Sequence, residues 1–252
     1  AGVNANPNEP AAYLYRAQYI LQNRQAEEAA ADIQKAESLP LQTRQQRMQM
    51  ASVYLAAGRL EETRRLLESL QAEESNDLSI WLLWAQWAVR LGSEEEMIRV
   101  AQEGMATLQP DPYDFLTTAA ELFIQARQWE QAESIIRQMT ERKEEPELIL
   151  YLQGILAQAK GDWPAAVSIW RKLSSASAGP DASIRLAQAL MEIGDPLAAI
   201  QHLRTVLLRF PDHTQAHALL ARWCLKEGRL SEAAEHIQQA LRKQPDNLEY
   251  RK

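Results

Sequence analysis

The side chains best suited to metal or acid–base chemistry in this 252-residue chain are four histidines near its C-terminal end. His213 and His217 are four residues apart, a spacing that places two imidazoles on one helix face, where they could hold a metal ion. No cysteine or third histidine lies at ligand spacing. His202 and His236 are 34 residues apart, which favours solvent-facing places of a repeated pattern. We therefore predict no metal site and no cofactor.

Other motifs for catalysis are missing from the sequence. It contains no glycine-rich phosphate loop, no metal-type cysteine pair and no nucleophile elbow. The single cysteine, Cys224, occupies a position where neighbouring stretches carry apolar residues, so we expect it to be buried. We predict a non-catalytic protein, with an enzyme or metal-binding protein that uses the C-terminal histidines as one alternative.

Net charge and hydropathy exclude several classes of partner. The formal net charge is -7 and the pI about 5.3, so the chain repels phosphate backbones and we predict no nucleic-acid partner. Apolar runs such as 80–85 and 148–152 are far shorter than the roughly 20 residues that span a bilayer, which predicts no membrane insertion. The compartment stays open between cytoplasm and bacterial periplasm.

A period of 34 residues organises the whole chain. We predict seven repeats in one solenoid domain, over residues 10–43, 44–77, 78–112, 113–146, 147–179, 180–213 and 214–247. We number the places of each repeat from its first residue. Place eight is always small: Ala17, Ala51, Ala85, Ala120, Gly154, Ala187 and Ala221. Small side chains at a fixed place indicate that two helices approach closely there.

Glycine and proline divide each repeat into two helices. Place fifteen carries Gly58, Gly92, Gly161, Gly194 and Gly228, which predicts a left-handed turn between the helices. Prolines cluster at or near place thirty-two, at Pro40, Pro110, Pro146, Pro180, Pro211 and Pro245, where we expect them to end the second helix. Each repeat therefore reads as a helical hairpin, and the fold class as all-α.

This pattern resembles the tetratricopeptide repeat (TPR) family, in particular its bacterial arrays. The match is cleanest in the last two repeats, with Leu186, Ala187, Ala199 and Pro211, then Leu220, Ala221, Ala233, Ala240 and Pro245. The resemblance implies a right-handed superhelical α-solenoid. The third repeat departs from the pattern with Trp81, Trp84 and Trp87, of which one could protrude as a binding anchor while the others fill the core.

The resemblance also implies a ligand-binding concave face, built from the first helix of each hairpin. Its positions in this sequence are mostly amides, small apolar residues and isolated charges, and no asparagine of the family's chaperone-binding clamp is present. The residues that we predict to touch a partner are Gln18, Gln22, Gln45, Met48, Ser52, Leu82, Gln86, Arg90, Asp114, Glu121, Gln125, Tyr151, Gln158, Gln188, Glu192, Arg222 and Lys226.

We expect a scaffold that binds another protein, through a peptide segment or a domain. A second interpretation is the repeat arm of a larger bacterial envelope machine for polysaccharide export or secretion. Pro7 and the stretch 248–251 look like parts of further repeats, which suggests an excised fragment with an uncapped apolar end. Such an end predicts possible self-association. The partner, the full-length context and the oligomeric state are not determined by the sequence.

Overall fold

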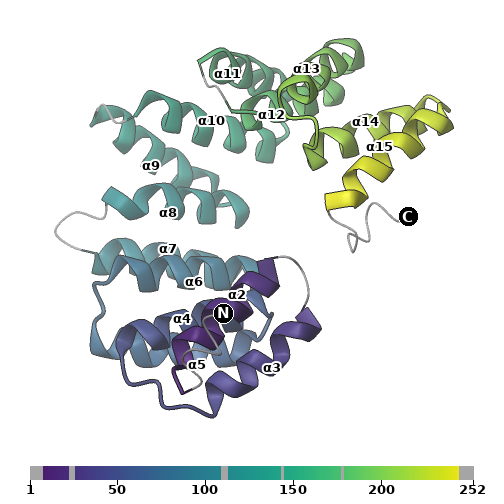
Figure 1. Cartoon of the computed structure of the whole chain (residues 1–252). Coiled ribbons are helices and arrows are strands. Elements are labelled where there is room, and N and C mark those ends of the chain that lie inside the picture. Colours follow the sequence, from purple (N-terminus) through teal and green to yellow (C-terminus); the bar gives the residue numbers. More distant parts are fainter. Residues whose placement is uncertain (1–7, 23–25, 109–112, 143–144, 177–178, 244–252) are drawn as a thin grey trace. The chain divides into compact units, whose positions relative to one another are not determined.

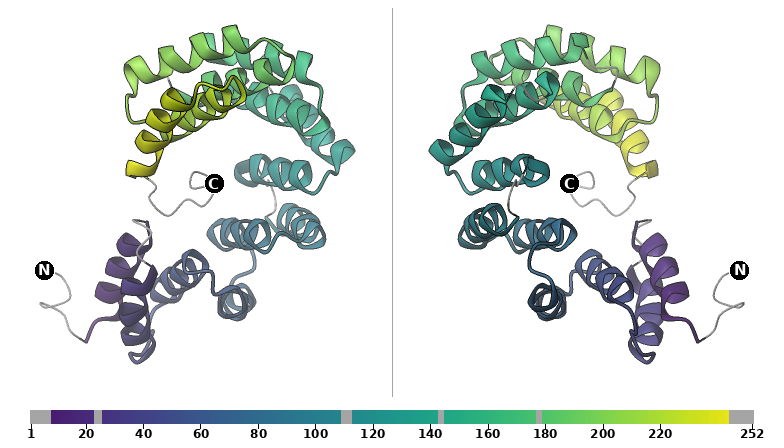
Figure 2. Two further views of the ribbon diagram at one scale, coloured as in Figure 1. Left: turned by 90° about the vertical axis from the view of Figure 1, so that its right-hand side faces the viewer. Right: turned by 90° about the vertical axis from the view of Figure 1, so that its left-hand side faces the viewer.

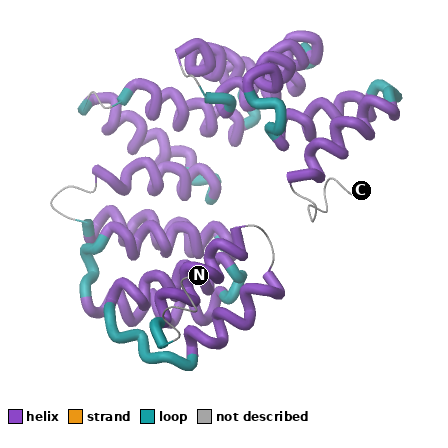
Figure 3. The backbone as a smooth tube through the Cα atoms, viewed as in Figure 1, coloured by secondary structure: helices purple, strands orange, loops and turns teal. Residues whose placement is uncertain are grey.

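The computed structural model describes residues 8–22, 26–108, 113–142, 145–176 and 179–243, and these form α-helices joined by short turns, with no strand among them (Figures 1 and 3). The helices in chain order are α2 (Pro10–Gln22), α3 (Ala26–Glu37), α4 (Arg44–Ala56), α5 (Leu60–Glu73), α6 (Leu78–Leu91), α7 (Glu94–Thr107), α8 (Tyr113–Gln125), α9 (Trp129–Glu141), α10 (Pro146–Lys160), α11 (Trp163–Ala176), α12 (Asp181–Glu192), α13 (Pro196–Arg209), α14 (Thr214–Lys226) and α15 (Leu230–Lys243). None of these helices has the length and apolar character needed to cross a bilayer. The predicted all-α class is confirmed.

The chain forms two compact units, which we call unit 1 (Ala1–Glu133) and unit 2 (Ser134–Lys252), with the boundary inside α9. In unit 1, α2 packs on α3, α4 on α5 and α6 on α7; in unit 2, α10 packs on α11, α12 on α13 and α14 on α15 (Figure 2). First helices also contact each other from one hairpin to the next, α2 with α4, α4 with α6, α6 with α8, and α12 with α14. This stacking of hairpins defines an α-solenoid. The superhelical course and the single-domain organisation stay predictions.

The turns inside the hairpins follow from glycine. All five glycines at place fifteen have φ between 72° and 83°, the left-handed region that side chains disfavour. The fourth hairpin lacks a glycine there, and Arg127 takes the same conformation with φ 56°. The left-handed turn therefore belongs to the hairpin geometry, and glycine is the residue that adopts it at the lowest cost.

The small residues at place eight let the two helices of a hairpin touch. Gly154 on α10 shows this best, because a Cβ atom added there would lie 2.6 Å from the ring of Trp170 on α11. The other six members of this set are buried alanines. A bulky side chain on one helix thus packs against a small one on its partner, as the repeat pattern predicts.

The three tryptophans of α6 are all core residues. Trp81, Trp84 and Trp87 are at most 3% exposed. Their indole nitrogens donate to the Ser75 carbonyl, to Gln71 Oε1 and to the Leu60 carbonyl, at 2.8, 3.0 and 2.9 Å. The suggestion that one of them protrudes as an anchor is wrong, because each indole finds its hydrogen-bond acceptor while its ring is covered.

Proline marks helix starts as well as ends. Pro146 was expected to end a second helix, but it is the first residue of α10, and Pro196 is the first residue of α13. A residue without an N–H loses no hydrogen bond at this position. Pro110 and Pro245, like Pro7 and the stretch 248–251, lie outside the described residues.

Candidate functional site

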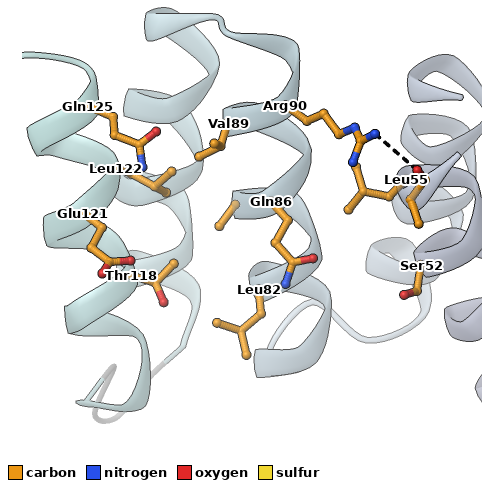
Figure 4. Close-up of a pocket in the computed structure, with 12 residues that line it drawn as sticks. Ser52, Leu55, Leu82, Gln86, Val89, Arg90, Thr118, Glu121, Leu122 and Gln125 are labelled. Carbon is orange, nitrogen blue, oxygen red and sulfur yellow. Dashed lines mark hydrogen bonds between the residues drawn. The ribbon is translucent and has the colours of Figure 1, made fainter. Parts of the chain in front are cut away.

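A groove runs across the first helices of three successive hairpins in unit 1, α4, α6 and α8 (Figure 4). It has a volume of about 690 Å³. Its lining residues are Ser52, Leu55 and Ala56 from α4, Leu82, Ala85, Gln86, Val89 and Arg90 from α6, and Thr118, Glu121, Leu122 and Gln125 from α8. The α6 residues are three or four positions apart and so share one helix face.

The groove combines a buried apolar base with polar groups around it. Leu55, Ala85 and Leu122 are at most 5% exposed, whereas Val89 is 41% exposed. Figure 4 shows the amides of Gln86 and Gln125 and the carboxylate of Glu121 beside this apolar surface. Such a mixture suits a partner that presents apolar side chains together with hydrogen-bonding groups.

One charged contact fixes the edge of the groove. The Arg90 guanidinium donates from Nη2 to the Ala56 carbonyl at 3.2 Å, so α6 is tied to the C-terminal end of α4 (Figure 4). Carbonyls in the last turn of a helix lack intrahelical partners, and a cation there is favourable. Arg90 on α6 and Glu121 on α8 give the groove one positive and one negative side chain.

A second hollow of about 390 Å³ adjoins the first on α2, α4 and α6. It shares Ser52, Leu82 and Gln86 with the groove and is also lined by Tyr15, Gln18, Gln45, Met48, Gln49, Ser79 and Leu83. All of its lining residues lie in unit 1. The two hollows therefore form one continuous surface along four successive first helices.

Nine of the predicted partner-binding residues line this surface: Gln18, Gln45, Met48, Ser52, Leu82, Gln86, Arg90, Glu121 and Gln125. Gln22 and Asp114 are exposed on α2 and α8 but line neither hollow. The remaining six lie on the first helices of unit 2, at Tyr151, Gln158, Gln188, Glu192, Arg222 and Lys226, and line neither hollow. A role in partner binding stays a prediction for all seventeen.

Sequence reasoning missed one place that recurs along the whole surface. Place six of the first four repeats carries Tyr15, Gln49, Leu83 and Thr118, and all four line a hollow. On a helix this place lies four positions after place two and three before place nine, which hold predicted partner-binding residues such as Gln45 and Gln86. Helix geometry alone could therefore have identified it.

The histidines are arranged differently from a metal site. His213 is the N-cap of α14, and its Nδ1 accepts a hydrogen bond from the Ala216 N–H at 3.3 Å. His217 Nε2 lies 2.8 Å from the Pro211 carbonyl, to which it must donate, and His217 Nδ1 lies 3.0 Å from His236 Nδ1. His213 and His217 thus bond to different groups and do not share one position for a metal ion. No group of three metal-ligating side chains occurs among the described residues.

The two histidines predicted to face solvent do so only in part. His202 and His236 are each partly covered, and burial lowers the pKa of both imidazoles. For His236 the neighbouring His217 lowers the pKa further, and for His202 the charge of Arg171 does so. Cys224 is 2% exposed, as predicted, and burial raises the pKa of its thiol. A thiol of this kind is a packing group and a poor nucleophile.

Comparisons with known proteins agree with this architecture. Residues 184–247 match the tetratricopeptide repeat family, and no curated protein matches the chain. A solved tetratricopeptide repeat protein from Parabacteroides merdae is 15% identical with a TM-score of 0.71, and the alignment covers 96% of each chain. PilW, described as a widely conserved type IV pilus biogenesis factor, is 13% identical with a TM-score of 0.58, over 84% of this chain and 98% of that one.

A Rap protein complexed with Competence and Sporulation Factor is 14% identical with a TM-score of 0.55, over 96% of this chain and 78% of the Rap chain. At such identities a structural likeness establishes the fold and nothing about the ligand. The described residues therefore have the tetratricopeptide-repeat fold, and residues 184–247 also match that family by sequence.

Proposed function

We propose that this protein is a non-catalytic scaffold that holds a segment of another protein in the groove on α4, α6 and α8. The observation that carries the proposal is the convergence of Ser52, Leu82, Gln86, Arg90, Glu121 and Gln125, from three helices, on one hollow of about 690 Å³. These residues were chosen from their repeat places alone. Their convergence supports a shared binding role.

The chemistry of the groove favours a peptide over a small metabolite. Its open surface is spread over three helices and offers amide and hydroxyl groups at intervals, without a cluster of titratable side chains. An extended segment can place alternate side chains on the apolar base while its backbone bonds to the glutamine amides. The complex of a Rap protein with Competence and Sporulation Factor is a case of this fold with a bound partner.

The test is a peptide selection followed by affinity measurements. Random displayed peptides are selected on the full chain, and the tightest one is titrated by calorimetry against wild-type protein and Val89→Lys. Val89 is exposed in the groove, so a lysine there should place charge on the apolar surface and weaken binding about tenfold or more.

Leu91→Lys is the matched control, because Leu91 is equally exposed at 43% on the same helix but does not line the groove. This variant should bind within about twofold of wild type. Failure to select any peptide, or equal affinities for Val89→Lys and wild type, would contradict the proposed function.

A second candidate is a repeat arm within a larger envelope assembly. It is favoured by the likeness to PilW, a type IV pilus biogenesis factor, whose chain is covered almost entirely. In that case the groove would hold a component of the same assembly. Cross-linking in a cell that expresses the full-length gene product would distinguish this role from that of a free scaffold, through the compartment of the cross-linked partner.

A further inference from the structure

The two hollows that form the candidate surface differ in charge. The groove on α4, α6 and α8 contains Arg90 and Glu121. The hollow on α2, α4 and α6 is lined by ten residues, none of which is Asp, Glu, Lys or Arg: Tyr15, Gln18, Gln45, Met48, Gln49, Ser52, Ser79, Leu82, Leu83 and Gln86. Since 24% of the residues in the chain are charged, ten lining residues without a charge carry fewer charges than the composition would give. Charged groups of a partner would lose water here without gaining an ion pair.

An amide on this surface lacks a hydrogen-bond partner. Gln49 Nε2 is buried and has no acceptor within the described residues. A buried donor without an acceptor costs free energy. A carbonyl oxygen of a bound segment would satisfy this donor after rotation of the Gln49 side chain into the hollow. Gln18, Gln45 and Gln86 line the same surface and provide further amide donors.

Apolar surface lies between these amides. Tyr15 is 61% exposed on α2, and Met48 of α4 and Leu82 of α6 are partly exposed within the hollow. An exposed aromatic ring beside a methionine and a leucine offers flat, adaptable contacts for apolar side chains. The hollow therefore combines apolar contacts with carboxamides that can donate and accept hydrogen bonds.

We propose that the hollow on α2, α4 and α6 binds an uncharged, proline-rich segment in the polyproline II conformation. This inference rests on the proposed function, since it specifies which part of a bound segment lies here. Polyproline II backbones have no internal hydrogen bonds, so their carbonyls are free to accept from glutamine amides. Proline rings pack well on aromatic and methionine side chains, and the prefolded segment loses little entropy on binding.

A helical occupant would satisfy these observations less well. The carbonyls of a helix interior already accept hydrogen bonds within the helix, so the amides of the hollow would stay unpaired. A surface helix also presents charged residues on its polar face, for which this hollow has no counter-charge. A β-strand could also pair with the glutamine carboxamides, which donate and accept, so the proline content of the selected peptides distinguishes the two occupants.

The test reads the composition of peptides selected on the full chain and the effect of variants on the tightest one. Selected peptides should contain more proline and fewer charged residues than the starting library. Tyr15→Ala should weaken the tightest peptide about tenfold, and Gln49→Leu, which removes the unpaired donor, about threefold or more.

Tyr19→Ala is the matched control, because Tyr19 is 68% exposed one turn further along α2 and does not line the hollow. It should leave the affinity within about twofold. Selected peptides that are rich in charge, or whose affinity is unchanged by Tyr15→Ala while Val89→Lys weakens them, would overturn this inference and leave the proposed function intact. Selection of no peptide at all would contradict both.

Discussion

Units 1 and 2 are built from the same hairpin, yet they use the face of the first helix differently. In unit 1, place five of the second and third repeats carries Met48 and Leu82, which line the open surface. In unit 2, place five of the fifth repeat carries Tyr151, whose ring packs edge-on against Trp170 while the Arg185 guanidinium lies over both rings. At Met48 and Leu82 this place lines a hollow, whereas at Tyr151 it packs against side chains of its own unit.

This difference separates two kinds of information in a repeat sequence. The family matches residues 184–247, which lie in unit 2, whereas both hollows that form the candidate site lie in unit 1. The repeat signature specifies how helices pack. Ligand chemistry depends on the places that the signature leaves free, so the strength of the family match does not indicate where a partner binds.

The largest expected effect comes from removal of the indole that fills unit 2. Trp170 is fully buried against Gly154, Tyr151 and Arg185, so Trp170→Ala should destabilise unit 2 by about 3–5 kcal/mol. Hydrogen exchange of the amides of α10 to α13 at increasing denaturant concentration would measure the loss of unfolding free energy. The peptide affinity of unit 1 should be unchanged, because its lining residues all lie before Glu133.

Trp163→Ala is the control for this substitution, since it removes a half-buried indole from the same helix. It should cost clearly less than Trp170→Ala. Equal costs would mean that burial of the Trp170 ring is not what stabilises this part of unit 2.

Two glycines allow the same kind of contact to be compared between the units. A Cβ at Gly154 would lie 2.6 Å from Trp170, and a Cβ at Gly104 of α7 would clash with the ring of Phe115 on α8. Overpacking costs about 1–3 kcal/mol, which should outweigh the ~1 kcal/mol that alanine gains over glycine in a helix. Gly154→Ala should therefore speed hydrogen exchange in unit 2 only, and Gly104→Ala in unit 1 only.

Each of these variants is the control for the other. If either glycine-to-alanine variant slowed hydrogen exchange in its own unit, the aromatic ring that faces the glycine would have to move aside without cost. A variant that changed exchange equally in both units would indicate that they unfold together, and the comparison between them would lose its basis.

Much of the fold could be predicted from the sequence because its determinants are local. The left-handed turns at Gly58 and Gly92 and the close contact at Gly154 each depend on one residue type at one place. The sequence was ambiguous where a residue type permits two outcomes. Pro146 could end one helix or begin the next, and the tryptophans of α6 could be buried or exposed, since these choices depend on neighbouring helices.

The candidate site was predictable in part. Residues such as Gln86 and Glu121 followed from their repeat places, and the structure brings them to one groove. The sequence could not distinguish residues that line a hollow from residues that pack against other side chains. Tyr151 packs against Trp170, nineteen residues further along the chain, and against Arg185 of the next hairpin. It could not locate the unpaired amide of Gln49 either, since hydrogen-bond satisfaction is a property of the packed state.

The smallest expected effect is one of pH, and it also distinguishes the units, because all four histidines lie after Ser134. Burial and the adjacent His217 lower the pKa of His236, so the unfolded chain takes up this proton at a higher pH than the folded chain. Stability that is present above the ordinary histidine pKa of about 6.5 is therefore lost as the pH falls below it.

The two rings are in direct contact, with His217 Nδ1 and His236 Nδ1 3.0 Å apart. Hydrogen exchange of α14 and α15, corrected for its intrinsic pH dependence, should accelerate between pH 7 and 5 relative to α4 and α6. His236→Gln should reduce this acceleration, because a glutamine amide can still donate to His217 and does not titrate. Equal acceleration in α4 and α6, or no change in His236→Gln, would show that the histidine pair does not cause the acid sensitivity of unit 2.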